Sequence, residues 1–531
     1  MAGVQPDCIV VSVAHPPRRA GKAVHCAATP PPGEPVFKEY ADYDATGLAG
    51  LVTRGGVAPA ELLEAAIARA ESLNPRLKAI NIPMLEIGRE RAAQPLHGPF
   101  AGVPFLIKDI AQDYAGVPST SGSRALRNWI APVHSEVVRR FLGAGLVIFG
   151  KTATPEFALK GLTETALWGA TRNPWDLQRT PGGSSGGAAA AVAAGIVPMA
   201  GASDGGGSIR IPAAYCGLFG LRPSRGRVPP GPLHGEFWDG ASSEHVLSRS
   251  VRDSARMLDV LAGADPGAPF VIAPPQRPYA EEVGRDPGRL RIGFCTRSPL
   301  GTPVDPACVQ AVRDTARLLE SLGHRVEEAE PQVDGQALAR CFVTMYFGQV
   351  AASMAEAKAA TGAGDTDFEL DTRALGMFGR ALSAGEYVQS RKQWNEFARA
   401  LGRFHQSHDL YLIPSTAMPP SRIGELDMPA AQQAALKVIL HLGVGRLLLG
   451  TGLVRQIVEQ SLQRVPFTQL SNLTGTPSMS LPLHWAPAEA GGPELPVGVQ
   501  FVARFGEEDT LLRLAAQLEQ ARPWQDRRPP P

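Results

Sequence analysis

Apolar residues recur along the chain with two different spacings, and the alternation between them predicts helices and strands in turn. In ELLEAAIARAESL (61–73) they recur at helical spacing, which predicts an amphipathic helix that ends at Asn74-Pro75. FAGVPFLIKDI (100–110) is an apolar run after a glycine that stops abruptly at Lys108, which predicts a buried strand. SEVVRRFLGAGLVIFGKT (135–152) then predicts a helix, a glycine turn and a strand.

Short apolar strands continue to alternate with helical segments towards the C-terminus. They are predicted at LVIFG (146–150), LRIGF (290–294), DLYLIP (409–414) and PVGVQFV (496–502). This alternation predicts an α/β fold in which helices are layered on a mixed sheet. No internal repeat and no clean linker divides the chain, so residues 36–525 are expected to form one large domain.

Three segments depart from this pattern. Residues 1–35 are dominated by proline, alanine and arginine after a short apolar run, and we expect a disordered extension there. Residues 526–531 are expected to form a frayed tail. The most apolar stretch, 438–454, is interrupted by Arg446 and several glycines, and it falls short of the roughly 20 apolar residues that a membrane span needs. We expect a buried pair of helices there, and no membrane contact.

Composition narrows the class of protein further. The 531 residues carry a formal net charge of +1, and a nucleic-acid binder would usually show a basic excess, so no nucleic-acid partner is expected. The six cysteines show no CxxC or Cys/His metal spacing, which favours reduced thiols in a cytoplasmic protein. Neither a metal ion nor a cofactor is expected.

The loop PGGSSGG (181–187) raises the question of chemistry, because it leads directly into the alanine-rich segment AAAAVAAG. A phosphate-binding loop would need a lysine after the glycines, and none is present. Residues 182–186 match the GxSxG pattern of a nucleophile elbow. An elbow, however, follows a strand, whereas RNPWDLQRTP precedes this loop. The remaining interpretation is a loop whose backbone is shaped for catalysis.

A second glycine cluster strengthens that interpretation. In SDGGGS (203–208) successive backbone N–H groups can converge on one point, and the short helix that follows adds positive potential there. Ser208 beside such a nest is placed to attack a carbonyl, since the developing oxyanion falls on those donors. The serine still needs a base, and no histidine lies near. Burial lowers a lysine pKa, so Lys108 is the candidate base, with the Ser184 hydroxyl between them.

Several long motifs resemble those of the amidase signature family of serine hydrolases. They are GVPFLIKD, GKTATPEFAL, TRNPWD, TPGGSSGGAAAAVAAG, SDGGGSIRIPAAYCGLFGLRPSRGRV, PFTQLSNLTGTPSMSLPL and LPVGVQFVARFGEEDTLLRLAAQLE. The similarity extends over residues 40–525 and is greatest to the bacterial amidases grouped with 6-aminohexanoate-cyclic-dimer hydrolase. It implies a single α/β/α domain whose mixed sheet is covered by helices on both faces.

The resemblance also implies roles for the residues of these motifs. Lys108 corresponds to the base, Ser184 to a serine in a cis peptide, and Ser208 to the nucleophile. The implied oxyanion donors are the backbone N–H groups of Gly205, Gly206, Gly207 and Ser208. Three more residues are expected to support the site: Asp204 and Arg210 as a pair that braces the loop, and Ser185 as either a hydrogen-bonding group or a helix N-cap.

The implied reaction is hydrolysis of a carboxamide through an acyl-enzyme, with a small-molecule amide substrate as the expected partner. Loops at 230–245 and 340–460 are expected to contact the substrate. Their apolar side chains favour a neutral aliphatic, aryl or cyclic amide: Phe237, Trp238, Phe342, Tyr346, Phe347 and Leu447. An amidotransferase A-type subunit acting in a complex and a non-hydrolytic scaffold protein are the alternatives. A homodimer is compatible with this interpretation.

Overall fold

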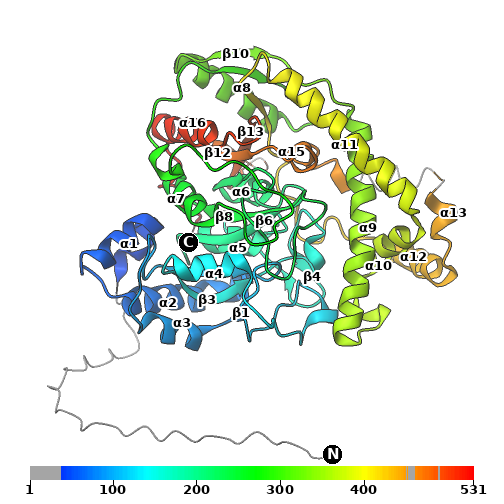
Figure 1. Ribbon diagram of the computed structural model, residues 1–531, viewed down its shortest axis with the longest axis horizontal. Helices are drawn as coiled ribbons and strands as arrows, with labels where there is room; N and C mark the ends of the chain where they lie inside the picture. The colour runs from blue at the N-terminus through cyan, green and yellow to red at the C-terminus, as the bar shows by residue number, and fades with distance from the viewer. Residues whose placement is uncertain (1–36, 450, 452–460, 488, 490, 531) are drawn as a thin grey trace, which may run out of the picture. The chain divides into compact units, whose positions relative to one another are not determined.

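A mixed sheet of eleven strands is the framework of the computed structural model, which describes residues 37–449, 451, 461–487, 489 and 491–530 (Figure 1). The strand order is β1-β3-β2-β6-β8-β7-β12-β13-β11-β9-β10. Strand β2 is parallel to β3 and β6, strand β9 is parallel to β10 and β11, and the other pairs are antiparallel. The predicted extension at 1–35 lies outside the described residues.

The strands are β1 (Ile80–Pro83), β2 (Pro104–Lys108), β3 (Val147–Thr152), β4 (Glu164–Thr165), β5 (Gly169–Ala170), β6 (Met199–Asp204), β7 (Phe219–Arg222), β8 (Ser243–Ser248), β9 (Arg291–Phe294), β10 (Arg325–Glu328), β11 (Leu410–Pro414), β12 (Ser478–Pro487) and β13 (Glu494–Val502). Strands β4 and β5 form a separate two-stranded ribbon. The described α-helices are α1 (Ala45–Thr53), α2 (Pro59–Leu77), α3 (Leu85–Ala92), α4 (Glu136–Gly143), α5 (Gly186–Ala193), α6 (Arg210–Cys216), α7 (Val251–Leu261), α8 (Pro306–Ser321), α9 (Gly335–Thr361), α10 (Leu370–Ala381), α11 (Ala384–Phe404), α12 (Ala430–Leu442), α13 (Gly445–Leu449), α15 (Gln469–Thr474) and α16 (Glu508–Ala521).

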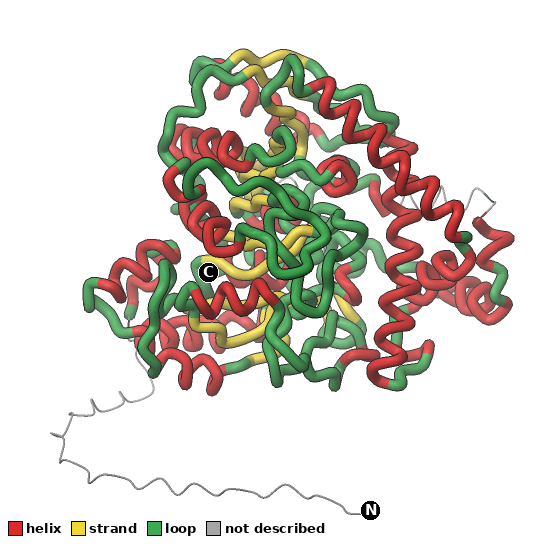
Figure 2. The backbone as a smooth tube through the Cα atoms, viewed as in Figure 1, coloured by secondary structure: helices red, strands yellow, loops and turns green. Residues whose placement is uncertain are grey.

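Both faces of the sheet are covered, and Figure 2 shows helices on either side of the strands. Successive side chains of a strand point to opposite faces. In β8, His245 faces helix α7, where its Nε2 lies 2.8 Å from Ser254 Oγ. The neighbouring Glu244 points to the other face. The predicted α/β fold with helices on both faces of a mixed sheet is confirmed.

The predicted elements around the site are also confirmed. Strand β2 falls within the run 100–110 and is buried along its whole length, and α4 and β3 follow as helix, glycine turn and strand. Helix α2, however, continues two residues beyond Pro75 and ends at Leu77. Lys78 takes a left-handed conformation there, and its N–H donates to the Asn74 carbonyl at 2.8 Å. Pro75 lies in the last turn, where few intrahelical bonds remain to be lost.

Helices α9, α10 and α11 lie side by side and enclose a second hydrophobic cluster (Figure 1). The expectation of a buried helix pair at 438–454 was wrong for its described part. Helix α12 has no buried residue, and Val438, Leu442 and Leu447 are 58%, 64% and 73% exposed. Only one side of α12 and α13 contacts the cluster, so apolar residues on the other side remain exposed.

Within the residues that the structure describes, no helix is long and apolar enough to cross a membrane. In the segment predicted to fray, Arg527 lies over the Trp485 ring at 4.4 Å and pairs with Glu494 at 3.4 Å. These two contacts attach Arg527 to strands β12 and β13, which the expectation of a frayed tail did not foresee.

Candidate active site

Lys108 is the last residue of strand β2 and lies in the interior of the protein. Its side chain is fully buried, and its Nζ lies 2.8 Å from Ser184 Oγ and 2.9 Å from Ser203 Oγ. Burial lowers the pKa of Lys108 to about 7, although the negative charges of Glu244 and Asp204 oppose this shift. A substantial fraction of the amine is therefore neutral near pH 7, and a neutral amine can accept a proton.

The loop before α5 brings Ser184 and Ser185 to this lysine. The Gly183–Ser184 peptide bond is cis, as the resemblance implied. Ser185 Oγ donates to the Ser203 carbonyl at 3.2 Å and accepts from the Ser203 N–H at 3.3 Å. Ser185 precedes α5 but makes no capping bond to it, so of the two expected roles the structure supports the hydrogen-bonding one. Its backbone N–H donates to the Ser208 carbonyl at 3.3 Å, which joins the two glycine loops.

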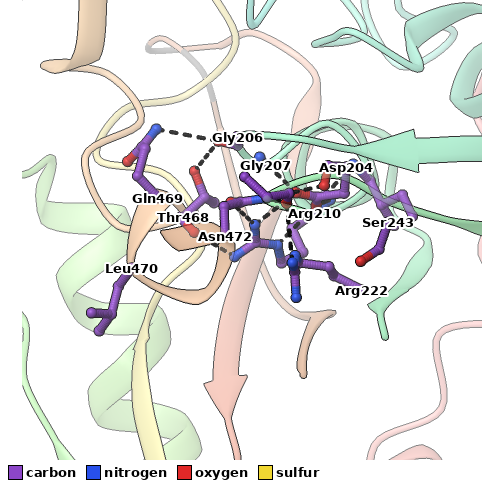
Figure 3. A network of polar contacts seen from close by, with 12 residues as sticks. Asp204, Gly206, Gly207, Arg210, Arg222, Ser243, Thr468, Gln469, Leu470 and Asn472 are labelled. Atoms are coloured by element: carbon purple, nitrogen blue, oxygen red, sulfur yellow. Dashed lines mark hydrogen bonds and ion pairs between the residues drawn. The ribbon is translucent and has the colours of Figure 1, made fainter. Parts of the chain in front are cut away.

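The second glycine loop connects β6 to α6 and ends in the half-buried Ser208. Gly207 has a φ of +124°, and a Cβ there would lie 2.5 Å from Thr468 Oγ1, so no larger residue fits. Thr468 Oγ1 and Gln469 Nε2 donate to the Gly206 carbonyl at 2.6 and 3.2 Å (Figure 3). Both contacts come from a segment more than 250 residues further along the chain.

One of the four expected oxyanion donors is already engaged. The Gly207 N–H donates to Asp204 Oδ1 at 2.8 Å. A donor aimed at a carboxylate is not aimed at a developing oxyanion, so the expectation for Gly207 is corrected. The N–H groups of Gly205, Gly206 and Ser208 remain the candidates.

Asp204 and Arg210 form the predicted brace, and both are fully buried. Arg210 Nη2 and Nε lie 2.8 and 2.9 Å from the Asp204 carboxylate oxygens. Although burial alone would raise the pKa of Asp204, the charge and hydrogen bonds of Arg210 hold it well below its usual range. Arg210 also donates to the Thr468 carbonyl and to the Asn472 side chain, which themselves lie beside the loop (Figure 3). The brace thus joins the glycine loop to α15.

We expect Arg210→Met to lower the free energy of unfolding by about 3–5 kcal/mol, because it leaves the Asp204 charge buried without its partner. Chemical denaturation of the purified variant measures this loss. Arg89→Met is the control, since Arg89 pairs with Glu64 at the surface, where an ion pair contributes at most about 1 kcal/mol. Equal losses in the two variants would contradict the bracing role of Arg210.

Aromatic side chains pack directly on the glycine loop. A Cβ at Gly205 would lie 2.6 Å from the Trp238 ring, and one at Gly206 would lie 2.6 Å from the Phe342 ring. Tyr346 contacts both rings, with centroid distances of 4.9 and 5.1 Å. We call Trp238, Phe342 and Tyr346 the aromatic wall. These are three of the six aromatic and aliphatic side chains expected to contact the substrate.

The other expected contacts do not all lie at this wall. Phe347 is buried against Phe378, with ring centroids 5.1 Å apart, and Leu447 is exposed on α13. Phe237 packs on His234 within its own loop, with ring centroids 4.8 Å apart. Tyr346 and Phe347 thus differ, because helical spacing sends neighbouring side chains of α9 in different directions.

The Ser185–Ser208 backbone hydrogen bond sets the loop of Ser208, with its backbone amides, beside the loop of Ser184, whose hydroxyl contacts the buried Lys108 amine. A nucleophile, an oxyanion site and a proton acceptor are what acyl transfer requires. Residues 61–512 match the amidase family, so the chain belongs to that family. It is an amidase, a hydrolase of amide carbon–nitrogen bonds.

Individual relatives agree with this assignment. The chain is 38% identical over 495 residues to the 6-aminohexanoate-cyclic-dimer hydrolase of Paenarthrobacter ureafaciens, covering 92% of this chain and 96% of that protein. A solved structure of 6-aminohexanoate cyclic dimer hydrolase superimposes with a TM-score of 0.84 at 36% identity, covering 92% and 99% of the two chains. A bacterial aryl acylamidase superimposes with a TM-score of 0.77 at 26% identity, covering 91% and 98%.

Proposed function

We propose that Ser208 is the nucleophile of this amidase and that Ser184 and neutral Lys108 take up its proton. Ser208 Oγ attacks the amide carbonyl while its proton passes to Ser184 Oγ, and the Ser184 proton passes to Lys108 Nζ. The Gly205, Gly206 and Ser208 N–H groups stabilise the oxyanion. The proton then returns by the same route to the leaving amine, and the carbon–nitrogen bond breaks to give an acyl-enzyme. Water, deprotonated along the same route, releases the carboxylate and restores Ser208.

The observation that carries this proposal is the 2.8 Å contact between Lys108 Nζ and Ser184 Oγ in a fully buried setting. A fluorophosphonate probe, which reacts with an activated serine, tests it without knowledge of the substrate. We expect one covalent adduct, located at Ser208 by mass spectrometry of the peptides. An unlabelled protein would instead favour the scaffold alternative.

We further propose that the substrate is a neutral aliphatic, aryl or cyclic amide. The aromatic wall supports this, because it sets uncharged rings against the glycine loop and offers no charged partner to an acyl group. The free thiols of Cys216, Cys295, Cys308 and Cys341 support a cytoplasmic location.

We expect a panel of amides to show turnover of neutral aliphatic, aryl and cyclic members. Trp238→Ala should then raise the KM for them by about tenfold or more with a smaller effect on kcat, because a large apolar contact is lost. Trp485→Ala is the control, since its ring packs on Trp175, away from the glycine loop. Turnover of malonamate or glutamine alone would contradict the proposed substrate class, and glutamine alone would favour an amidotransferase A-type subunit.

A further inference from the structure

The site contains a buried carboxyl group that the proposed mechanism does not use. Glu244 on β8 is 3% exposed, and it is paired in register with Ser203 on the antiparallel strand β6. Directly paired residues of two strands project from the same face of the sheet. Ser203 Oγ lies 2.9 Å from Lys108 Nζ. The register therefore puts the Glu244 side chain on the same face as Ser203, one of the two hydroxyl partners of Lys108.

Gln112 connects this carboxyl group to the backbone of the lysine. Its Oε1 accepts a hydrogen bond from the Lys108 backbone N–H at 2.8 Å, and its Nε2 donates to Glu244 Oε2 at 2.8 Å. Nε2 also lies 3.3 Å from the Ala202 carbonyl. A Cβ at Gly201 would lie 2.1 Å from Gln112 Oε1, so β6 leaves room for this amide only because position 201 is a glycine. The Gln112 amide is thus held by Lys108, by Glu244 and by the Ala202 carbonyl of β6.

The second oxygen of Glu244 has no hydrogen-bond partner among the described residues. An unpartnered buried carboxyl oxygen is costly unless the group is neutral or serves another charge. Burial raises the pKa of Glu244 to about 7, while the Gln112 bond and the Lys108 charge oppose the rise. The Lys108 amine and the Glu244 carboxyl group therefore both titrate near pH 7.

The charged groups around this pair come from several elements. Asp204 at the end of β6 acts on Lys108, and Asp113 acts on Glu244. Asp113 accepts a hydrogen bond from Ser119, and Asp204 is paired with Arg210. On β3, the neighbour of β2, Lys151 lies 3.5 Å from Asp109, which gives that aspartate its own partner. Among the described residues, Lys108 is the only cation whose charge acts on Glu244.

We propose that Glu244, held in place by Gln112, is a positioning residue that sets the proton affinity of Lys108. Its negative charge stabilises the lysine ammonium that forms when Ser208 gives up its proton, and the Gln112 bridge holds the carboxyl group to the backbone of Lys108. Without it, the buried amine would bind a proton too weakly to serve as an acceptor. This inference rests on the proposed function, because it assigns to Lys108 the role of proton acceptor.

The test is the pH dependence of the rate at which the fluorophosphonate probe labels Ser208. In the unchanged enzyme the rate should fall as the pH drops through about 7, because Lys108 becomes protonated. In Glu244→Gln the fall should move to lower pH by roughly one to three units, because an opposite charge that favoured the ammonium is gone. We call this fall in the labelling rate at low pH the acidic limb of the profile. Glu244→Asp, which keeps the charge, should return the limb towards its original pH.

Glu156→Gln is the matched control. Glu156 is also a buried glutamate, but its carboxylate bonds to Ser123, Thr372 and the Glu369 N–H, outside this network. We expect its labelling profile to keep the limb of the unchanged enzyme. A general disturbance of packing would instead lower the labelling rate at every pH without moving the limb.

A second variant covers the case in which Glu244→Gln does not fold. Gln112→Met removes the hydrogen bond to Glu244, raises the pKa of that carboxyl group further, and should also move the limb to lower pH. An unmoved limb in the folded variant overturns this inference while Ser208 labelling still supports the proposed function. Failure of labelling in the unchanged enzyme, or labelling that does not need Lys108, overturns the proposed function itself.

Discussion

Ser208→Ala should reduce kcat by at least roughly four orders of magnitude, because the variant has no atom that can form the acyl-enzyme. The loss should come without a change in Tm, since the side chain is half-buried and small. Hydrolysis of the best neutral amide of the panel measures the first quantity, and a thermal melt measures the second.

Ser321→Ala provides the comparison for this result. Ser321 is exposed at the end of α8, and its Oγ donates only to the Leu318 carbonyl. The same change there should leave kcat as it is. The preparation of Ser208→Ala must contain no unchanged enzyme. Near-normal turnover by such a preparation would contradict the assignment of Ser208 as nucleophile.

Lys108→Met should have an effect of similar size. Methionine keeps the buried length of the side chain but cannot accept a proton, so Ser184 has nowhere to pass the proton from Ser208. We expect kcat to fall by roughly three orders of magnitude or more. The fall in activity below pH 7 should also disappear from the residual rate, because the group whose pKa is about 7 is gone.

Another buried lysine separates this catalytic effect from the loss of a buried amine in general. Lys151 on β3 is equally buried and lies 3.5 Å from Asp109. Lys151→Met should lower the free energy of unfolding by about 3–5 kcal/mol by leaving Asp109 without its partner. The folded fraction should still turn over substrate. If Lys108→Met behaved in the same way, Lys108 would be a structural residue only.

Local sequence patterns predicted the parts of the site that are formed by neighbouring residues. The apolar run of β2 ends at Lys108, and the glycines of 205–207 mark the loop at Ser208. Asp204 and Arg210 are close enough in sequence for their pairing to be expected. These features depend on periodicity, turn residues and charge, all of which are visible in a short window.

The partners from distant segments could not be predicted in this way. Thr468 and Asn472 reach the glycine loop from α15, and Glu244 reaches Lys108 through the register of β6 and β8. Strand order and register are set by the whole sheet, so no local pattern reports them. The same limit explains the error at α12, since apolar content does not tell which side of a helix a neighbour will cover.

The dependence of the glycine loop on α15 has a consequence for biosynthesis. Ser208 and Lys108 leave the ribosome early. The Gly206 carbonyl, however, bonds to Thr468, and Arg210 bonds to Thr468 and Asn472, which are synthesised more than 250 residues later. A growing chain therefore carries Ser208, the proposed nucleophile, long before Thr468 and Asn472 have been synthesised. Amide hydrolysis should begin only once nearly the whole chain has been synthesised, and prematurely terminated chains should be inert towards the amides of the cell.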